Sequence, residues 1–228
     1  MHIRLLEPPN GWTGLGFEFV TIVVGVLVAL AAQELVQSLH WRREVEETRK
    51  ALDAEVARDA AAFQYRMNQR PCVEQRLTEL VRWVDSHRSG KPLALKKGIT
   101  APPGFELRSA AWDVTDGEIA TRIPLQVKMS YATIYDSMKS FDELTDSEQA
   151  QWSTLQQFEN ADRLQKAELR TIGQAIREIG SMNEALAGYK IAIDGPFKQL
   201  KISPEKDIEA RSAPIIAKWN RELCEPLL

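Results

Sequence analysis

The chain has 228 residues, of which 44% are hydrophobic and 27% charged, with 29 Lys and Arg against 32 Asp and Glu. This balance excludes wholesale disorder and a multispanning membrane protein, and the length predicts one sizeable core, because an average domain has about 150 residues. The formal net charge of -3 gives no sign of the clustered positive surface that binds phosphates, so we expect no nucleic-acid partner. Two cysteines are too few for a disulfide scaffold or a four-cysteine zinc site.

An uncharged, strongly apolar stretch covers residues 19–33 (FVTIVVGVLVALAAQ). It is shorter than the roughly 20 residues that cross a bilayer, but apolar neighbours extend it. We therefore expect an N-terminal tail at residues 1–15 and a single transmembrane helix at residues 16–37. Trp12 and Trp41 flank this segment, where indole rings suit the two membrane surfaces.

Two other interpretations compete with a membrane span. Residues 29–31 (ALA) have the small-x-small form that a signal peptidase cleaves. However, a signal peptide has a positively charged region before its apolar core. Here Arg4 is the one basic residue before the apolar stretch, and Glu7 and Glu18 are acidic. A buried core helix is the second alternative, and the charge-free composition is more extreme than a soluble core needs.

One face of the expected transmembrane helix is small and carries a carboxylate. Spacings of three, four and seven residues bring together Glu18, Gly25, Ala29 and Ala32. Small residues let two backbones approach closely, so this face predicts a helix–helix contact with Glu18 as a polar anchor. The alternative is that glycine and alanine are simply common in spanning helices. The expected partners are the lipid bilayer and other membrane protein subunits or a second copy of the chain.

The segment from Gly11 to Glu55 contains GWTGLGFEF, VVGVLVALAAQELV and LHWRREVEETRKALDAEV in this order. It resembles a group of uncharacterised bacterial single-pass membrane proteins, in which a Glu precedes a VVxGVLIAL-like spanning segment and a charged helix follows directly. A looser similarity continues through Cys72, residues 109–112 (SAAW) and residues 124–135. The resemblance implies an anchored helical protein and supplies no catalytic residues.

Helical periodicity dominates residues 38–228, and no strand alternation of useful length occurs. Proline and glycine are absent between Gly25 and Gln69, which predicts that the membrane helix continues as a stalk to about Gln69. In chain order, the other expected elements are a helix at 71–86, an irregular loop at 87–107, a turn at 109–114, a helix at 124–141, a long helix at 145–188 and a final helix from residue 203, bent near Pro214. We therefore expect an all-α fold, with residues 38–228 forming an antiparallel bundle of four or five helices.

Local signals support the starts of these helices. Proline suits the first turn of a helix, and Pro124 predicts a helix whose inner side includes Leu125 and Met129. The sequence from Thr145 to Glu148 (TDSE) matches a capping box and predicts the start of the long helix. Gly188 then suits its end.

Recognisable catalytic and metal-binding patterns are missing from the sequence. None of His2, His40 and His87 has a second ligand at a metal-binding spacing, and no Walker-type, GxGxxG or GxSxG sequence occurs. We therefore expect no enzyme activity, no cofactor and no metal site. Weak ligand or partner candidates near an Asp-Gly turn and the helix after it are Trp112, Asp113, Asp116, Tyr131 and Tyr135. Solvated acids at a turn and boundary tyrosines are their more ordinary interpretation.

Cys72 and Cys224 lie at the ends of expected helices rather than within an apolar stripe. If the final helix returns toward the distal end of the stalk, the two residues meet and form a disulfide in an oxidising compartment. The alternative is a pair of unbonded, small apolar side chains.

The orientation signals conflict. Basic residues follow the span at Arg42, Arg43, Arg49 and Lys50, and positive-inside counting would leave the bundle in the cytoplasm. A disulfide and a short N-terminal tail favour the opposite side. We expect a signal-anchored protein of the bacterial inner membrane with its bulk in the periplasm, acting as a scaffold or accessory subunit of a membrane complex. The alternative function is an extracytoplasmic ligand-sensing bundle.

Overall fold

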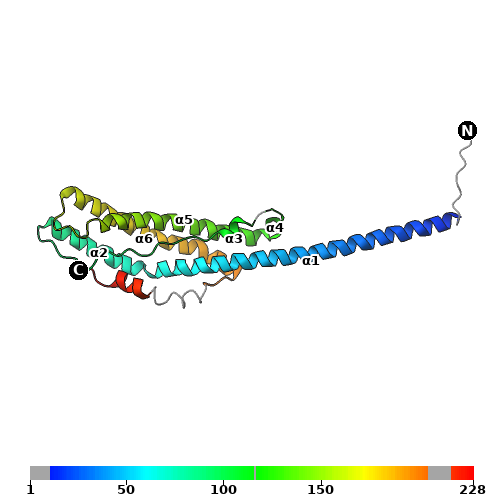
Figure 1. The fold of residues 1–228 in the computed structure, drawn as a ribbon, viewed down its shortest axis with the longest axis horizontal. Coiled ribbons are helices and arrows are strands. Elements are labelled where there is room, and N and C mark those ends of the chain that lie inside the picture. The colour runs from blue at the N-terminus through cyan, green and yellow to red at the C-terminus, as the bar shows by residue number, and fades with distance from the viewer. Residues whose placement is uncertain (1–10, 116, 205–216) are drawn as a thin grey trace, which may run out of the picture. The chain divides into compact units, whose positions relative to one another are not determined.

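The computed structural model describes residues 11–115, 117–204 and 217–228. In chain order its elements are α1 (Gly11–Asn68), α2 (Arg70–Arg88), α3 (Ala110–Asp113), α4 (Gly117–Arg122), α5 (Leu125–Gln156) and α6 (Lys166–Leu200) (Figure 1). Residues 217–224 are also helical, and the described residues contain no strand. The all-α class, the long N-terminal helix and the helical bundle are therefore confirmed.

The chain divides into two compact units, residues 1–48 and residues 49–228, which we describe separately. In the first unit, every large apolar side chain from Phe17 to Leu39 is exposed. Of the helices that the structure describes, α1 is the one that is long and apolar enough to cross a membrane. A soluble protein seldom leaves so long an apolar surface uncovered, so its exposure suits a helix surrounded by lipid.

The helix α1 ends where the sequence predicts. It continues to Asn68, and a single residue, Gln69, separates it from α2. Pro71 lies in the first turn of α2, where a missing backbone N–H costs no helical hydrogen bond. The next turn begins normally, because the backbone N–H of Val73 donates to the carbonyl of Gln69 at 3.1 Å.

The capping box expected at Thr145 is wrong. Thr145 and Glu148 lie inside α5, which is one continuous helix, and both are buried. The Thr145 hydroxyl donates to the carbonyl of Asp142, and the Glu148 carboxylate accepts from Arg66 rather than from the backbone near Thr145. A capping box needs a non-helical residue at its first position, and here tertiary contacts keep that position helical.

The prediction of one long helix at 145–188 is also wrong, because neither its start nor its end is a helix boundary in the structure. The chain leaves α5 after Gln156 and begins α6 at Lys166, where the Glu168 carboxylate accepts the backbone N–H of Gln165 at 2.6 Å. Gly188 does not end the helix, which continues through Pro196 to Leu200. It ends at Lys201, which has a left-handed backbone with a φ of 59°. The bend expected near Pro214 lies outside the described residues.

The inner side of α5 differs from the expectation. Leu125 and Met129 are 63% and 54% exposed. The buried stripe begins at Tyr131 and continues through Ile134 and Met138. The apolar stripe therefore starts between one and two turns after the start of the helix, and Tyr131 contacts α1 through its hydrogen bond to Asp53.

The part of α1 in the second unit runs parallel to α5. The residue numbers of contacting pairs increase together along the two helices, as in Asp53–Tyr131, Glu55–Tyr135, Phe63–Phe141 and Arg66–Glu148. Parallel neighbours need a return connection, and residues 89–109 supply it. This connection contacts α5 and α1 in the reverse order, through the pairs Ile99–Gln156, Pro102–Gln149 and Arg108–Asp59.

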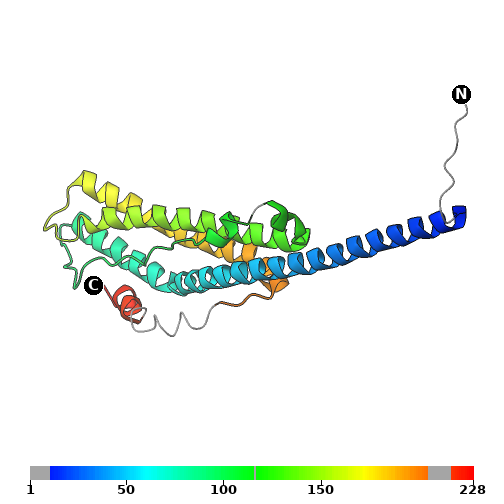
Figure 2. The same cartoon turned by 45° about the vertical axis from the view of Figure 1, so that its right-hand side comes forward.

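The helix α6 runs antiparallel to its neighbours. Figures 1 and 2 show it beside α5, and its contacts with α2 run in opposite senses along the chain, from Arg70 with Asn183 to Arg88 with Gly173. The bundle thus combines antiparallel packing with one parallel pair. Its main core lies where α2, α5 and α6 meet, and it buries Trp83 and Trp152 almost completely.

A buried ion pair joins α1 to α5. Arg66 is 2% exposed and Glu148 is 1% exposed, and one guanidinium nitrogen lies 2.7 Å from each carboxylate oxygen. The Trp152 indole N–H donates to the same carboxylate at 3.2 Å. Such a pair is stable only while both charges are present, because either alone would lie unsolvated in the core.

We therefore expect Glu148→Leu to destabilise the protein by about 3–5 kcal/mol, because it leaves a buried guanidinium without its counter-charge. The double variant Arg66→Met/Glu148→Leu should recover most of this loss. A control, Asp85→Ala, removes one partner of an exposed pair with Arg88 and should cost less than about 1 kcal/mol. Thermal unfolding of the detergent-purified chain measures all three, and equal losses in the single, double and control variants would contradict the prediction.

Candidate functional site

The expected membrane-contact residues lie on an open surface of the first unit. Glu18, Gly25, Ala29 and Ala32 are all exposed. A Cβ atom added at Gly25 would meet no atom of the chain within 4 Å. A larger side chain at this position therefore fits the isolated helix, and any effect of such a change reports a contact with another molecule.

A network of buried polar groups centres on Glu55 of α1. One carboxylate oxygen accepts the Tyr135 hydroxyl at 2.5 Å, and the other accepts the backbone N–H of Ala111 at 2.9 Å. The Trp112 backbone N–H also points to this carboxylate, at 3.4 Å. The Trp112 ring stacks on the Tyr135 ring with centroids 5.0 Å apart. Three segments distant in sequence, α1, α3 and α5, therefore meet at one side chain.

Two further carboxylates on α1 extend this network. Asp53 accepts a hydrogen bond from the Tyr131 hydroxyl. Asp59 is 1% exposed, and its two oxygens accept the backbone N–H of Arg108 at 3.2 and 3.4 Å. Both acids thus bind elements that pack on α1, and Asp59 is buried whereas Asp53 is half-buried.

Burial changes the acidity of these groups. It raises the pKa of Asp59 from the ordinary 3.8 to about 7, with Glu55 and Asp142 adding to the rise and Arg108 opposing it. Burial and the nearby carboxylates also raise the pKa of the Tyr131 and Tyr135 hydroxyls. The two hydroxyls therefore stay protonated and act as hydrogen-bond donors.

The structure brings together three of the five weak candidates, Trp112, Tyr131 and Tyr135. Asp113 is exposed and accepts the hydroxyl of Ser109 at 2.8 Å, outside the network. Asp116 lies outside the described residues. The sequence analysis missed the acids of α1, because a charged stalk suggests a solvated face.

A signal for these acids was nevertheless present. Glu55 and Asp59 follow Leu52 by three and seven residues, so they share its face of the helix. Leu52 itself is fully buried. Acids at core positions of an amphipathic helix are a sign of buried partners.

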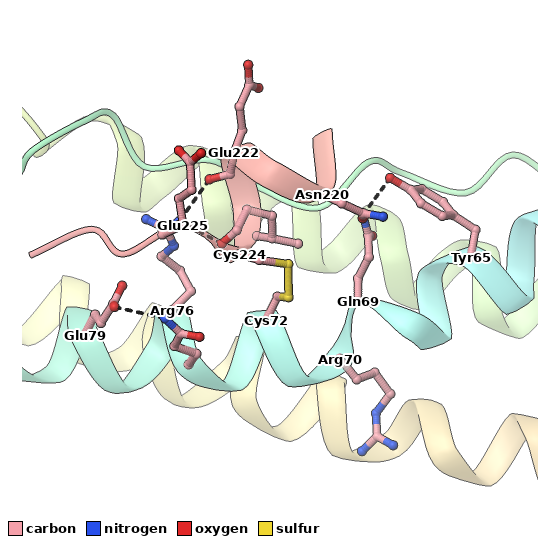
Figure 3. The surroundings of a disulfide bond; sticks show 12 residues. Tyr65, Gln69, Arg70, Cys72, Arg76, Glu79, Asn220, Glu222, Cys224 and Glu225 are labelled. Carbon is pink, nitrogen blue, oxygen red and sulfur yellow. Dashed lines mark hydrogen bonds between the residues drawn. A yellow bond between two sulfur atoms is a disulfide. The ribbon is translucent and has the colours of Figure 1, made fainter. Parts of the chain in front are cut away.

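The C-terminal segment, residues 217–228, packs against α2. A disulfide joins Cys72 to Cys224 across 152 positions of the sequence, which is the pairing that the sequence left open (Figure 3). Beside it, one Arg76 guanidinium nitrogen donates to three backbone carbonyls, those of Glu222, Leu223 and Glu225, at 2.7–3.0 Å. These bonds satisfy carbonyls that the end of a helix leaves without partners.

Further contacts hold the same segment. Leu223 and Leu227 are 2% and 0% exposed and belong to the main core. The Glu79 carboxylate accepts the backbone N–H of Leu227 at 2.9 Å, and the Lys97 ammonium donates to the carbonyl of Glu222 at 2.8 Å. The C-terminal segment is therefore part of the bundle and not a loose tail.

A surface hollow of about 400 Å³ lies between α2, the connection after it and the turn that precedes α6. Trp83, His87 and Leu95 form part of its wall, and Glu159 and Asp162 add carboxylates. Its chemistry suits a small molecule with an apolar body and a cationic group. Glu159 also has a structural role, because it accepts the backbone N–H of Ile99 at 2.8 Å.

No group of three or more His, Cys, Asp or Glu side chains suited to a metal ion occurs among the residues that the structure describes. Comparison of the chain with protein-family models, curated proteins and solved structures found no match. The function must therefore be argued from the residues themselves.

We expect the disulfide to contribute up to about 5 kcal/mol, because it closes a very long loop in the unfolded chain. The variant Cys72→Ser/Cys224→Ser should unfold at a lower temperature than the native protein. A reducing agent should lower the unfolding temperature of the native protein and leave that of the variant unchanged, which is the control. Mass mapping without reduction should find a peptide that links the two cysteines, and free thiols would contradict the prediction.

Proposed function

We propose that the chain is a single-pass membrane-anchored interaction protein, a scaffold or accessory subunit of a membrane complex. The observation that carries this proposal is that every large apolar side chain from Phe17 to Leu39 is exposed, on a helix that continues into a folded bundle. Lipid covers most of such a helix, and its small face suits contact with a second helix. This combination supports a protein whose position in the membrane and contacts there are its main role.

The use of the buried polar groups supports an interaction role over catalysis. Glu55, Asp59 and Arg76 each bind backbone groups of another segment. Arg66 and Glu148 bind each other. These side chains hold the bundle together, whereas a catalytic group has to reach a substrate. We accordingly propose no reaction for this chain.

The disulfide supports an extracytoplasmic position for the bundle. Disulfides persist in the periplasm and other oxidising compartments, and they are rare in the cytoplasm. The four basic residues after the span argue for the opposite orientation. We give the disulfide more weight than this count, because a cytoplasmic bundle would keep Cys72 and Cys224 reduced. We therefore place the bundle in the periplasm and the span in the inner membrane.

A ligand-sensing bundle is the second candidate function. The hollow beside Trp83 and His87 favours it, because the two carboxylates and the aromatic side chains in its wall suit a small organic cation. The hollow is open to the surface and one of its acids already binds the backbone, so we rank this function below the interaction role.

Larger side chains on the small face of the span test whether this face contacts another helix. Gly25→Leu and Ala29→Leu should each weaken helix association, either with a second copy or with a partner subunit, by about tenfold. Ala31→Leu is the matched control, because Ala31 lies on the opposite face of the helix. Chemical cross-linking in native membranes, with mass spectrometry of the products, measures the loss. Equal cross-linking in all three variants would show that this face makes no helix contact and that its glycine and alanines are simply common in spanning helices.

The orientation is tested by fusion proteins. An alkaline phosphatase attached after Leu228 should be active, because this enzyme folds only where its own disulfides form. A fluorescent protein that matures only in the cytoplasm should stay dark at the same position. The opposite pair of results would place the bundle in the cytoplasm and contradict the proposed location, without bearing on the association of the span.

A further inference from the structure

Buried carboxylates hold the segment Arg108–Trp112, which we name the latch, against α1. The latch donates three backbone N–H groups, those of Arg108, Ala111 and Trp112, and all three go to acids of α1. Just before the latch, the backbone N–H of Leu107 lowers the pKa of Asp142 of α5, while burial raises it. Side-chain acids therefore take the place that a neighbouring backbone would have in a helix or sheet.

Asp59 and Glu55 differ in the hydrogen-bond donors that they bind. Glu55 accepts a tyrosine hydroxyl in addition to its two backbone N–H groups. In the part of the chain that the structure describes, the Arg108 N–H is the one hydrogen-bond donor to Asp59, and it is shared between the two oxygens at more than 3 Å. A carboxylate that is 1% exposed and has one weak donor is poorly stabilised in its charged form.

The other charges around Asp59 do not compensate for this. The groups that face it are Glu55 on α1, Asp142 and Tyr135 on α5, and the exposed Arg108 of the latch. Two of these groups are acids, and one is a cation in contact with water. Burial raises the pKa of Asp142 as well, so two neighbouring acids favour a bound proton.

We propose that the latch is operated by a proton on Asp59: the latch stays closed on α1 while Asp59 is protonated, and its release is favoured once Asp59 has lost that proton to solvent. The direction of the pH effect follows from the linkage between proton binding to Asp59 and opening of the latch. Asp59 binds its proton with a pKa of about 7 when buried and near the ordinary 3.8 when solvated. Opening therefore releases one proton, and rising pH favours the open state until the buried group itself is ionised.

Opening has defined structural consequences. It separates Trp112 from the Tyr135 ring and admits water to Glu55 and Asp59. The acidic face of α1 then becomes part of the surface, while the ion pair of Arg66 and the core beyond it lie two turns further along the helix. The change is thus local, and it requires neither a ligand nor the membrane contact proposed above.

Hydrogen–deuterium exchange of the full chain in detergent tests the latch directly, because the amides of Arg108, Ala111 and Trp112 are its donors. After correction for the chemical exchange rate, their protection should fall at least about tenfold between pH 5 and pH 8 and level off above pH 7. The variant Asp59→Asn keeps an acceptor and cannot ionise. It should keep the amides protected at pH 8 and abolish the pH dependence.

Asp136→Asn is the matched control, because it removes an exposed acid from α5 next to Tyr135. It should retain the native pH profile. Protection of the three native amides that does not change with pH would overturn the proposal, and this result needs no variant that folds. A pH profile in Asp59→Asn equal to the native one would overturn it too, because the proton would then act elsewhere.

Discussion

The burial of charge along α1 is the constraint on which the rest of the bundle depends. Between Asp53 and Arg66 this helix places four ionisable side chains against other segments, and each needs a partner of suitable chemistry. Arg66 meets Glu148, which sets the register of α5 on α1. The tyrosines about four and five turns earlier on α5 then reach the acids about three and four turns earlier on α1. A shift of α5 by one turn would leave several of these groups unpaired.

The same chemistry holds the two segments of the second unit that are not regular bundle helices. The connection after α2 presents backbone N–H groups, and the acids of α1 accept them. The C-terminal segment presents backbone carbonyls at a helix end, and Arg76 and Lys97 donate to them. In both cases an ionisable side chain satisfies backbone groups that lack a helical partner. The bundle therefore includes two irregular segments whose backbone groups are bonded by side chains of the helices.

These two attachments differ in how they can be released. The C-terminal segment has a disulfide and two buried leucines in addition to its charged contacts, so its position is secured by covalent and apolar forces. The latch depends in part on Asp59, a buried carboxyl group with a raised pKa. A single protein thus contains one segment fixed by oxidation and one whose contacts respond to protons. Both features suit an exposed compartment, where the protein meets changes in the medium directly.

The amino-acid sequence alone predicted the helical class, the long apolar N-terminal helix, the junction at Gln69 and the helix that follows Pro124. These features depend on local properties: apolar length, the spacing of prolines and glycines, and the periodicity of one face. The sequence did not predict that α5 continues through Thr145 or that α6 continues through Gly188. A local capping pattern competes there with burial in the bundle, and burial prevails, since Thr145 and Glu148 are each 1% exposed.

Only the tertiary structure decided the parallel direction of α1 and α5 and the meeting of Trp112, Tyr135 and Glu55. The segments involved are about 55–80 residues apart, and periodicity within one helix carries no information about which side of another helix it meets. The pairing of Cys72 with Cys224 was open for the same reason. Local sequence determined which segments are helical and which is apolar enough for a membrane, whereas the need to pair buried charges determined how the helices are arranged.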